Sequence, residues 1–274
     1  MVYIGMDIGT SKPTPDVLAQ APHRLIDILQ PNQVYSTARF RADALAAMSE
    51  IAGRGRIPLL VGGTMLYLRA LQQGLARLPS ADPTLRGAIV DEASAIGWPA
   101  MHEHLARLDP TSARRIHPND PHRIQRALEV HAITGRPMSE LIHEAGDTAD
   151  LPYRLLKLVR APSERGLLHE RIEQRFRSML ARGLVDEVAQ LWARGDLTAD
   201  LPSMRSVGYR QVLRYITGDA SWDEMRYTGI AASRQLARRQ LTWLRAESDG
   251  HWLADEPHAV GDAVDRITRM MCPT

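Results

Sequence analysis

The sequence predicts an α/β protein whose parallel sheet is interrupted by a helical insertion. Strand-like runs occur at residues 24–29, 57–61 and 155–159. The first two strands alternate with helical patterns through short connections, as parallel strands require. Residues 81–153 show helical patterns and no convincing strand. We therefore expect an α/β core formed by residues 1–80 and 154–274, with a helical domain from residue 81 to 153 inserted into it.

Composition limits the class of protein. The chain has 274 residues, of which 44% are hydrophobic and 24% charged, with a net charge of +2. These values are ordinary for a globular protein, and the net charge alone does not indicate a nucleic-acid binder. The single cysteine, Cys272, excludes an intramolecular disulfide and a cysteine-based metal site. No apolar run reaches membrane length and no signal pattern opens the chain, so we predict a cytoplasmic protein.

The first half of the core is predicted to be strand, helix, strand, helix. After the run at residues 24–29, Ser36 is a candidate N-cap for a helix that continues to about Ala52. Residues 57–61 form an apolar run suited to a strand buried on both faces. Gly62 and Gly63 end this run, and Thr64 is placed to cap a helix over residues 65–71.

This second strand-to-helix turn is a candidate anion site. Free backbone N–H groups at the positive end of a helix dipole bind phosphates, and two glycines let a phosphate approach closely. An ordinary turn of an α/β protein would show the same pattern, because a glycine motif by itself is weak evidence.

The remaining elements are predicted to be mostly helical. Five helices fill the insertion, after a cluster of breakers at residues 79–83; they cover residues 84–96, 99–108, 111–115, 121–134 and 138–145. A strand at residues 155–159 returns to the core. Four further helices follow, at residues 164–182, 184–194, 209–217 and 222–247.

Basic residues are concentrated in three places. The first is 122–126 at the start of a predicted helix, and the second is 205–210, where Tyr209 lies between two arginines. The third is the last predicted helix, where Arg234, Arg238 and Arg245 form a row beside an apolar stripe. Each cluster could be a solvated helix face with local ion pairs. Together, with Tyr209 and Trp243 interleaved, they make nucleic-acid contact an equally good interpretation.

Segments along the whole chain resemble the tRNA dimethylallyltransferase family, also called tRNA isopentenyltransferases. The combination includes Val-Gly-Gly-Thr-Met-Leu-Tyr, His-Pro-Asn-Asp and Val-Gly-Tyr-Arg-Gln. The matching segments are residues 5–14, 25–29, 59–68, 109–113, 116–120, 123–130, 204–211 and 234–245.

The resemblance implies a reaction and its partners. Such enzymes transfer a dimethylallyl group from dimethylallyl diphosphate to the exocyclic amine of the adenosine 3′ of the tRNA anticodon. The resemblance implies a fold like that of the ATP-binding P-loop kinases, with an insertion that holds the anticodon stem-loop. It also implies a flipped target base, Mg²⁺ that neutralises the leaving diphosphate, and a monomer without membrane contact.

The same resemblance assigns roles to residues. Thr64 would be the catalytic residue at the reaction centre, and Gly62, Gly63, Arg205 and Arg210 would line the diphosphate channel. The residues expected to contact tRNA are Met1, Arg86, His122, Arg123, Ile124, Gln125, Arg126, Arg205, Ser206, Val207, Gly208, Tyr209, Arg210, Arg238, Arg239, Gln240, Trp243 and Arg245.

One departure from the family pattern concerns the start of the chain. Gly5, Gly9 and Lys12 have the wrong order for a phosphate loop. The family's phosphate loop, its first strands and an aspartate resembling a general base would precede Met1, and Asp7 does not replace that aspartate. We expect the 274-residue chain to lack turnover and to be poorly soluble, with unpaired strand edges. A tRNA-binding fragment without catalysis and a small-molecule kinase are the alternatives.

Overall fold

The computed structural model describes residues 1–76, 78–145, 151–253 and 258–271, and Cys272 lies outside them. The chain forms two compact units. The first comprises Met1–Leu68 and Tyr153–Thr274, and the second comprises Arg69–Pro152. The second unit thus begins earlier in the chain than the predicted insertion.

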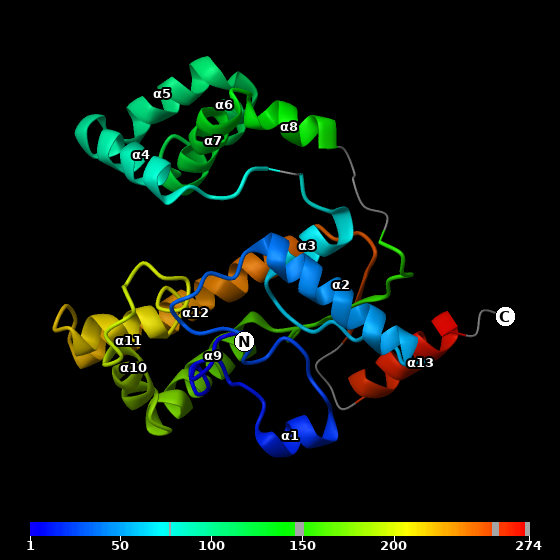
Figure 1. Ribbon diagram of the computed structural model, residues 1–274. Coiled ribbons are helices and arrows are strands. Elements are labelled where there is room, and N and C mark those ends of the chain that lie inside the picture. Colours follow the sequence, from blue (N-terminus) through cyan, green and yellow to red (C-terminus); the bar gives the residue numbers. More distant parts are fainter. Residues whose placement is uncertain (77, 146–150, 254–257, 272–274) are drawn as a thin grey trace. The chain divides into compact units, whose positions relative to one another are not determined.

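The first unit is rich in helices and contains a small parallel sheet (Figure 1). Helices α9 to α12 pack in sequence, because α9 contacts α10, α10 contacts α11, and α12 contacts both α11 and α9. The elements are α1 (Pro15–Gln20), α2 (Thr37–Gly53), the first turn of α3 (Met65–Gln73), β1 (Lys157–Arg160), α9 (Arg165–Ala181), α10 (Leu184–Trp192), α11 (Tyr209–Ile216), α12 (Trp222–Arg245), β2 (Gly250–Leu253) and α13 (Ala259–Met271).

The sheet pairs two strands from distant parts of the chain. Lys157 of β1 pairs with Gly250 of β2, and Arg160 with Leu253. The prediction placed the first of these strands at 155–159 and did not include the second, nor helices α1 and α13. Val159 and Leu253 are buried, so the pairing covers one apolar residue from each strand.

Two predicted strands are wrong. In the run at residues 24–29, Leu25 and Asp27 have positive φ angles of 62° and 53°, which an extended strand does not allow. Only an isolated parallel bridge between Tyr3 and Leu29 forms there. Residues 57–61 have no strand structure either.

The run at residues 57–61 is exposed where the prediction had it buried. Leu59 is 75% exposed and Val61 is 80% exposed. A strand exists only when a neighbour accepts its backbone hydrogen bonds, and β1 and β2 pair only with each other within the described residues. An apolar run therefore sufficed to predict a strand but not to form one.

The helices of the first unit follow their capping signals closely. Ser36 accepts a hydrogen bond from the backbone N–H of Arg39 (3.1 Å), as an N-cap does. Ser221 and Glu224 form a capping box at the start of α12. Gly183, with a φ of 96°, separates α9 from α10 as predicted. None of the helices in the described ranges has the length and apolar character needed to cross a bilayer.

Helix α12 packs tightly on α9 near its N-terminal end. A Cβ atom on Gly229 would lie 2.2 Å from the ring of Phe176, so only glycine permits this approach. Arg234 donates a hydrogen bond to Glu173 of α9 at 3.0 Å. Arg234 therefore belongs to the helix packing, and the apolar stripe predicted beside it is half-buried.

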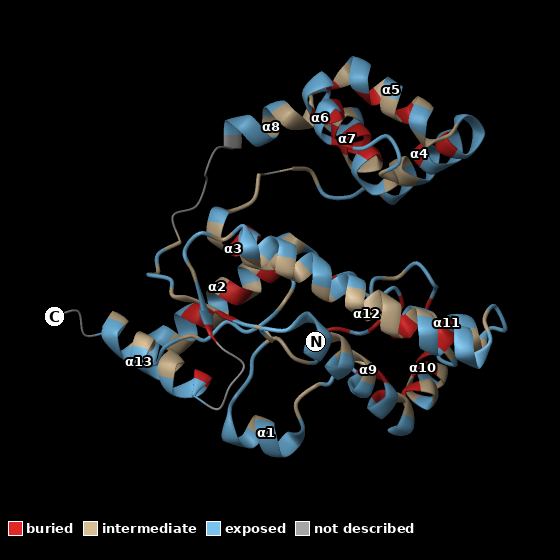
Figure 2. Cartoon of the chain, turned by 180° about the vertical axis from the view of Figure 1, so that it is seen from behind, coloured by how far each residue is buried: buried red, intermediate tan, exposed pale blue. Residues whose placement is uncertain are grey.

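Within its described residues, the second unit contains five complete helices around its own core, in addition to the end of α3. Figure 2 shows buried segments on α4, α5 and α7. The core side chains come from four of the five helices and from the link after α6. Its elements are α4 (Pro83–Ile96), α5 (Trp98–Leu108), α6 (Pro110–Arg115), α7 (Pro121–Thr134) and α8 (Met138–Ala145), and the buried core residues are Ile89, Ala93, Met101, Leu105, Ala113, Ile116, Ile124, Ala127 and Leu128. All five helices agree with the prediction within a residue or two.

Asp109 connects two of these helices through a buried carboxylate. It caps α6 by accepting hydrogen bonds from the backbone N–H (2.9 Å) and hydroxyl (2.6 Å) of Ser112. It also accepts bonds from the N–H (2.9 Å) and hydroxyl (2.6 Å) of Ser139 in α8. Burial alone would raise the pKa of Asp109, but these four bonds hold it below its ordinary value.

We expect Asp109→Asn to destabilise the second unit by about 1–3 kcal/mol, because an amide cannot accept all four bonds. The folded pKa of Asp109 is lowered, so its contribution is present above about pH 4 and is lost as the pH falls below it. Urea unfolding and hydrogen exchange in α6 and α8, measured from pH 7 to pH 3, test this. Equal stability and an equally steep loss in acid for both proteins would contradict it.

Candidate active site

Thr64 lies on an open turn at the start of α3. Its carbonyl accepts hydrogen bonds from the backbone N–H groups of Tyr67 (2.9 Å) and Leu68 (3.3 Å), which begin the helix. The side chain is exposed, and its hydroxyl has no hydrogen-bond partner among the described residues. A hydroxyl at the positive end of a helix dipole is thus accessible to a substrate carrying negative charge.

Tyr67 anchors this helix to α2. Its ring stacks on Phe40, with centroids 4.5 Å apart and planes 15° apart, and its hydroxyl donates to the carbonyl of Tyr35 at 3.1 Å. Since Tyr67 is one turn after Thr64, this contact fixes the base of the turn that carries the threonine.

Gln240 of α12 makes a second contact with the turn that bears Thr64. Its side-chain amide donates a hydrogen bond to the carbonyl oxygen of Gly63 at 2.9 Å. Gln240 was predicted to contact tRNA, but in the structure its amide is bound within the chain. This bond places the turn that bears Thr64 against the arginine-bearing helix.

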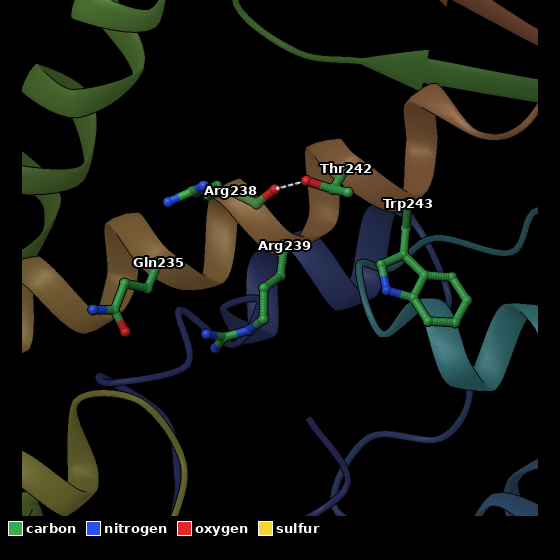
Figure 3. Close-up of a pocket in the computed structure, with 5 residues that line it drawn as sticks. All are labelled: Gln235, Arg238, Arg239, Thr242 and Trp243. Atoms are coloured by element: carbon green, nitrogen blue, oxygen red, sulfur yellow. Dashed lines mark hydrogen bonds between the residues drawn. The ribbon is translucent and has the colours of Figure 1, made fainter. Parts of the chain in front are cut away.

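A shallow depression of about 360 Å³ lies on α12, lined by Gln235, Arg238, Arg239, Thr242 and Trp243. We call it the arginine surface. Figure 3 shows Gln235, Arg239 and Trp243 projecting from one side of the helix, as their spacing of four residues dictates. Thr242 turns its hydroxyl back to the carbonyl of Arg238 (3.0 Å).

Guanidinium groups on this part of α12 are available for an anionic ligand. Arg238, Arg239 and Arg245 are exposed, and none of them is paired with a carboxylate in the part of the chain that the structure describes. Arg210 of α11 is also exposed and without such a partner there, and α11 packs directly on α12. The C-terminal half of α12 and the start of α11 thus present four arginines that have no carboxylate partner among the described residues.

Glu187 of α10 joins two of the motifs that the sequence singled out. Its carboxylate accepts hydrogen bonds from the backbone N–H groups of Asp7 (2.9 Å), Ile8 (2.7 Å) and Gly9 (3.2 Å). The same carboxylate accepts a bond from the hydroxyl of buried Tyr209. Burial and Glu187 both raise the pKa of Tyr209, which keeps the phenol protonated as a donor.

Lys12 stabilises the N-terminal loop whose backbone N–H groups bind Glu187. Its ammonium group pairs with both Asp7 and Asp27 and donates to the carbonyl of Tyr3 at 3.1 Å. Burial alone would lower the pKa of Lys12, but the two carboxylates raise it above its ordinary value. Lys12 is therefore a charged structural residue, in agreement with its rejection as a phosphate-loop lysine.

In the second unit, Arg86 and Arg126 both bind Glu129, which is fully buried. Arg86 donates to it at 2.9 and 3.2 Å and Arg126 at 2.6 Å, and the backbone N–H of Asp82 adds a bond at 2.8 Å. Burial by itself would raise the pKa of Glu129, but these donors lower it below its ordinary value. The two arginines thus neutralise a carboxylate that the sequence analysis overlooked.

Residues 1–247 match the family model of the IPP transferases. This chain belongs to the IPP transferase family. It is 59% identical over 246 residues to a tRNA dimethylallyltransferase of Thioalkalivibrio sulfidiphilus, a match that covers 90% of this chain and 77% of that relative.

Solved structures of family members have the same fold. The tRNA isopentenylpyrophosphate transferase of Bacillus halodurans is 34% identical, with a TM-score of 0.68 over 97% of this chain and 84% of that one. The Staphylococcus epidermidis enzyme is 32% identical, with a TM-score of 0.65 over 98% and 87%. A eukaryotic dimethylallyltransferase acting on tRNA is 24% identical, with a TM-score of 0.79 over 98% and 70%, and shows likeness of fold alone.

Among the residues that this family resemblance assigned to tRNA, the structure makes two corrections. Ile124 has no exposed surface because it faces the helical core, and Tyr209 is equally buried with its hydroxyl on Glu187. Side chains with these positions cannot contact RNA directly. Gly208 is also buried, and its φ of 94° requires glycine at the start of α11.

The other predicted contacts have varied environments. Arg123 pairs with Asp120 at 3.4 Å, and Gln125 donates to the carbonyl of Arg86 at 3.2 Å. His122, Arg205 and Trp243 also have interactions within the chain, and Met1 is partly exposed. Ser206 bonds the carbonyl of Pro202 at 3.2 Å, while Val207 is half-buried.

We expect Glu187→Gln to lower the free energy of unfolding by about 1–3 kcal/mol. The glutamine amide has a single acceptor oxygen, and its NH2 group would face the groups that now donate hydrogen bonds to Glu187. The backbone N–H groups of Asp7, Ile8 and Gly9 should then exchange faster. Urea unfolding and hydrogen exchange measure both effects. Asp186→Asn, the neighbouring exposed carboxylate on α10, is the control for loss of charge. Equal behaviour of the two variants would disprove the role of Glu187.

Proposed function

We propose that the chain transfers a dimethylallyl group from dimethylallyl diphosphate to the exocyclic amine of the adenosine 3′ of a tRNA anticodon, acting as a monomer. One observation carries this proposal: in a member of the IPP transferase family, a Thr64 hydroxyl with no hydrogen-bond partner among the described residues lies on a turn that is bonded to the arginine-bearing helix α12. The family match gives no support to a small-molecule kinase or to a protein that only binds tRNA.

The proposed chemistry is a displacement at the allylic carbon. The amine nitrogen forms a bond to that carbon, the carbon–oxygen bond to diphosphate breaks, and the electron pair leaves with the diphosphate. The nitrogen then releases a proton. Thr64 would donate its hydroxyl to the leaving oxygen or accept from the amine. Arg210 would bind the diphosphate through its planar fork, which matches the geometry of phosphate oxygens.

The exposed basic residues would bind the RNA. Arg238, Arg239 and Arg245 would bind phosphates from α12, and His122 and Arg123 would do so from the helical unit. Phosphate contacts of this kind set the register of the RNA on the protein, while the target base is turned out of its stack. The arginines around Glu129 would act indirectly, by shaping the start of α4 and α7.

Two further parts of the proposal rest on the family resemblance. The core would be of the P-loop-kinase type. Mg²⁺ would neutralise charge on the leaving diphosphate. Within the described ranges no three histidine, cysteine or acidic side chains are grouped to hold a metal, so no residue is assigned to it and no step depends on it.

Incubation of the chain with anticodon stem-loop RNA and dimethylallyl diphosphate tests the activity. The expected product is RNA with one dimethylallyl group on the adenosine 3′ of the anticodon, identified by nuclease digestion and mass spectrometry. RNA that is bound but never modified would overturn the proposal in favour of a binding protein, and would agree with the expectation from the sequence that the chain lacks turnover.

We expect Thr64→Val to lower kcat about a hundredfold, because it removes a hydroxyl that acts on developing charge. Thr64→Ser keeps the hydroxyl and should retain most of the turnover. RNA affinity, measured by fluorescence anisotropy, should stay the same in both variants. Full activity of Thr64→Val would show that the hydroxyl takes no part in the reaction.

We expect Arg238→Ala and Arg239→Ala each to weaken RNA binding and to reduce the slope of log affinity against log salt by about one. Each substitution removes one phosphate contact and the counterion release that goes with it. Arg226→Ala is the matched control on the same helix, since Arg226 pairs with Asp223 at 3.2 Å. An unchanged salt slope in the first two variants would place the RNA elsewhere.

A further inference from the structure

We propose that Gln240 is a positioning residue that couples RNA binding on α12 to the placement of Thr64. The inference deepens the proposed function and rests on it. Gln240 lies in the helix that carries the arginine surface, directly after Arg239 in the chain. Its side-chain amide donates a hydrogen bond to the turn that precedes α3.

The bond acts on the peptide unit that leads into Thr64. The carbonyl of Gly63, which accepts from Gln240 at 2.9 Å, belongs to the same planar group as the backbone N–H of Thr64. Fixing one end of a planar peptide fixes the direction of the other. Gln240 therefore orients the backbone of Thr64 without touching its side chain.

Gly63 is adapted to this contact by its lack of a side chain. A Cβ atom there would lie 2.2 Å from the amide nitrogen of Gln240, a separation that no pair of non-bonded atoms tolerates. Gly63 is not among the glycines with a positive φ angle. A side chain at residue 63 would therefore displace the amide of Gln240, although the backbone conformation does not itself require glycine.

Among the described residues, the half of α12 that carries Gln240 is less buried than its N-terminal half. The fully buried residues that the structure describes on this helix, Met225 and Gly229, lie in its N-terminal half. Leu236 and Trp243, farther along, are 39% and 38% exposed. RNA bound to the arginine surface would restrain this half of α12, and the bond to Gly63 would pass that restraint to Thr64.

Steady-state kinetics on the full chain separate this role from direct RNA contact. With anticodon stem-loop RNA and dimethylallyl diphosphate, we expect Gln240→Ala and Gln240→Glu to lower kcat about tenfold, since small misplacement of a reacting group is costly. KM and Kd for the RNA should change less than twofold. The glutamate variant keeps the shape of the side chain but has no donor for the carbonyl of Gly63.

Two glutamines serve as comparisons. Gln190→Ala removes an exposed amide from α10 and should leave both kinetic constants unchanged. Gln235→Ala removes an amide from the arginine surface but not from the turn, so any effect should fall on KM. A raised KM with normal kcat in Gln240→Ala would show instead that Gln240 contacts RNA directly.

Hydrogen exchange gives a readout that does not require turnover. RNA should slow exchange in the first turn of α3 in the unsubstituted chain and in Gln190→Ala, but not in Gln240→Ala. Equal slowing in all three would overturn the coupling even if transfer occurs. If the unsubstituted chain neither binds nor modifies the RNA, the proposed function fails first, and the coupling fails with it.

A double substitution tests the close approach. Gly63→Ala should lower kcat in the unsubstituted background because its methyl group displaces Gln240. The same change in Gln240→Ala should have a much smaller effect, since the clash is gone. Equal losses in both backgrounds would show that the two residues do not act through each other.

Discussion

The first unit depends on the hydrogen bonds that the carboxylate of Glu187 accepts. One carboxylate accepts three successive backbone N–H groups from residues 7–9 and the hydroxyl of Tyr209. Backbone N–H groups that converge in this way form an anion-binding nest. Here the anion is part of the protein, so the loop is ordered before any substrate arrives. A Cβ atom on Gly9 would meet the Tyr209 ring at 2.5 Å, which shows how closely the two motifs are packed.

Different faces of helix α12 make different contacts. Gly229 and Arg234 attach it to α9, Gln240 reaches the turn before Thr64, and the arginine surface remains open. A helix can do this because residues that are not three or four apart point in different directions. The Thr64 hydroxyl and the arginine surface come from parts of the chain far apart in sequence, and this helix is the element that brings them together.

Residues that interact locally were predictable from the sequence, and those that depend on distant partners were not. The five helices of the second unit could be predicted because caps such as Asp82 and Asp120, each followed by proline, mark their starts. The strand at 57–61 was wrongly predicted, because a strand needs a neighbour that its own residues do not specify. The same limit applies to charge: the pattern around Arg86 and Arg126 resembles a solvated basic face, and only the fold shows the buried Glu129 between them.

The link between residues 7–9 and Glu187 also sets an order of assembly during synthesis on the ribosome. The helical unit has mainly local contacts and can fold as soon as residue 152 has emerged. The loop of residues 7–9 is made before α10, which carries the acceptor of its N–H groups, and before Tyr209 of α11, which shares that acceptor. Its ordering therefore waits until both helices have been synthesised.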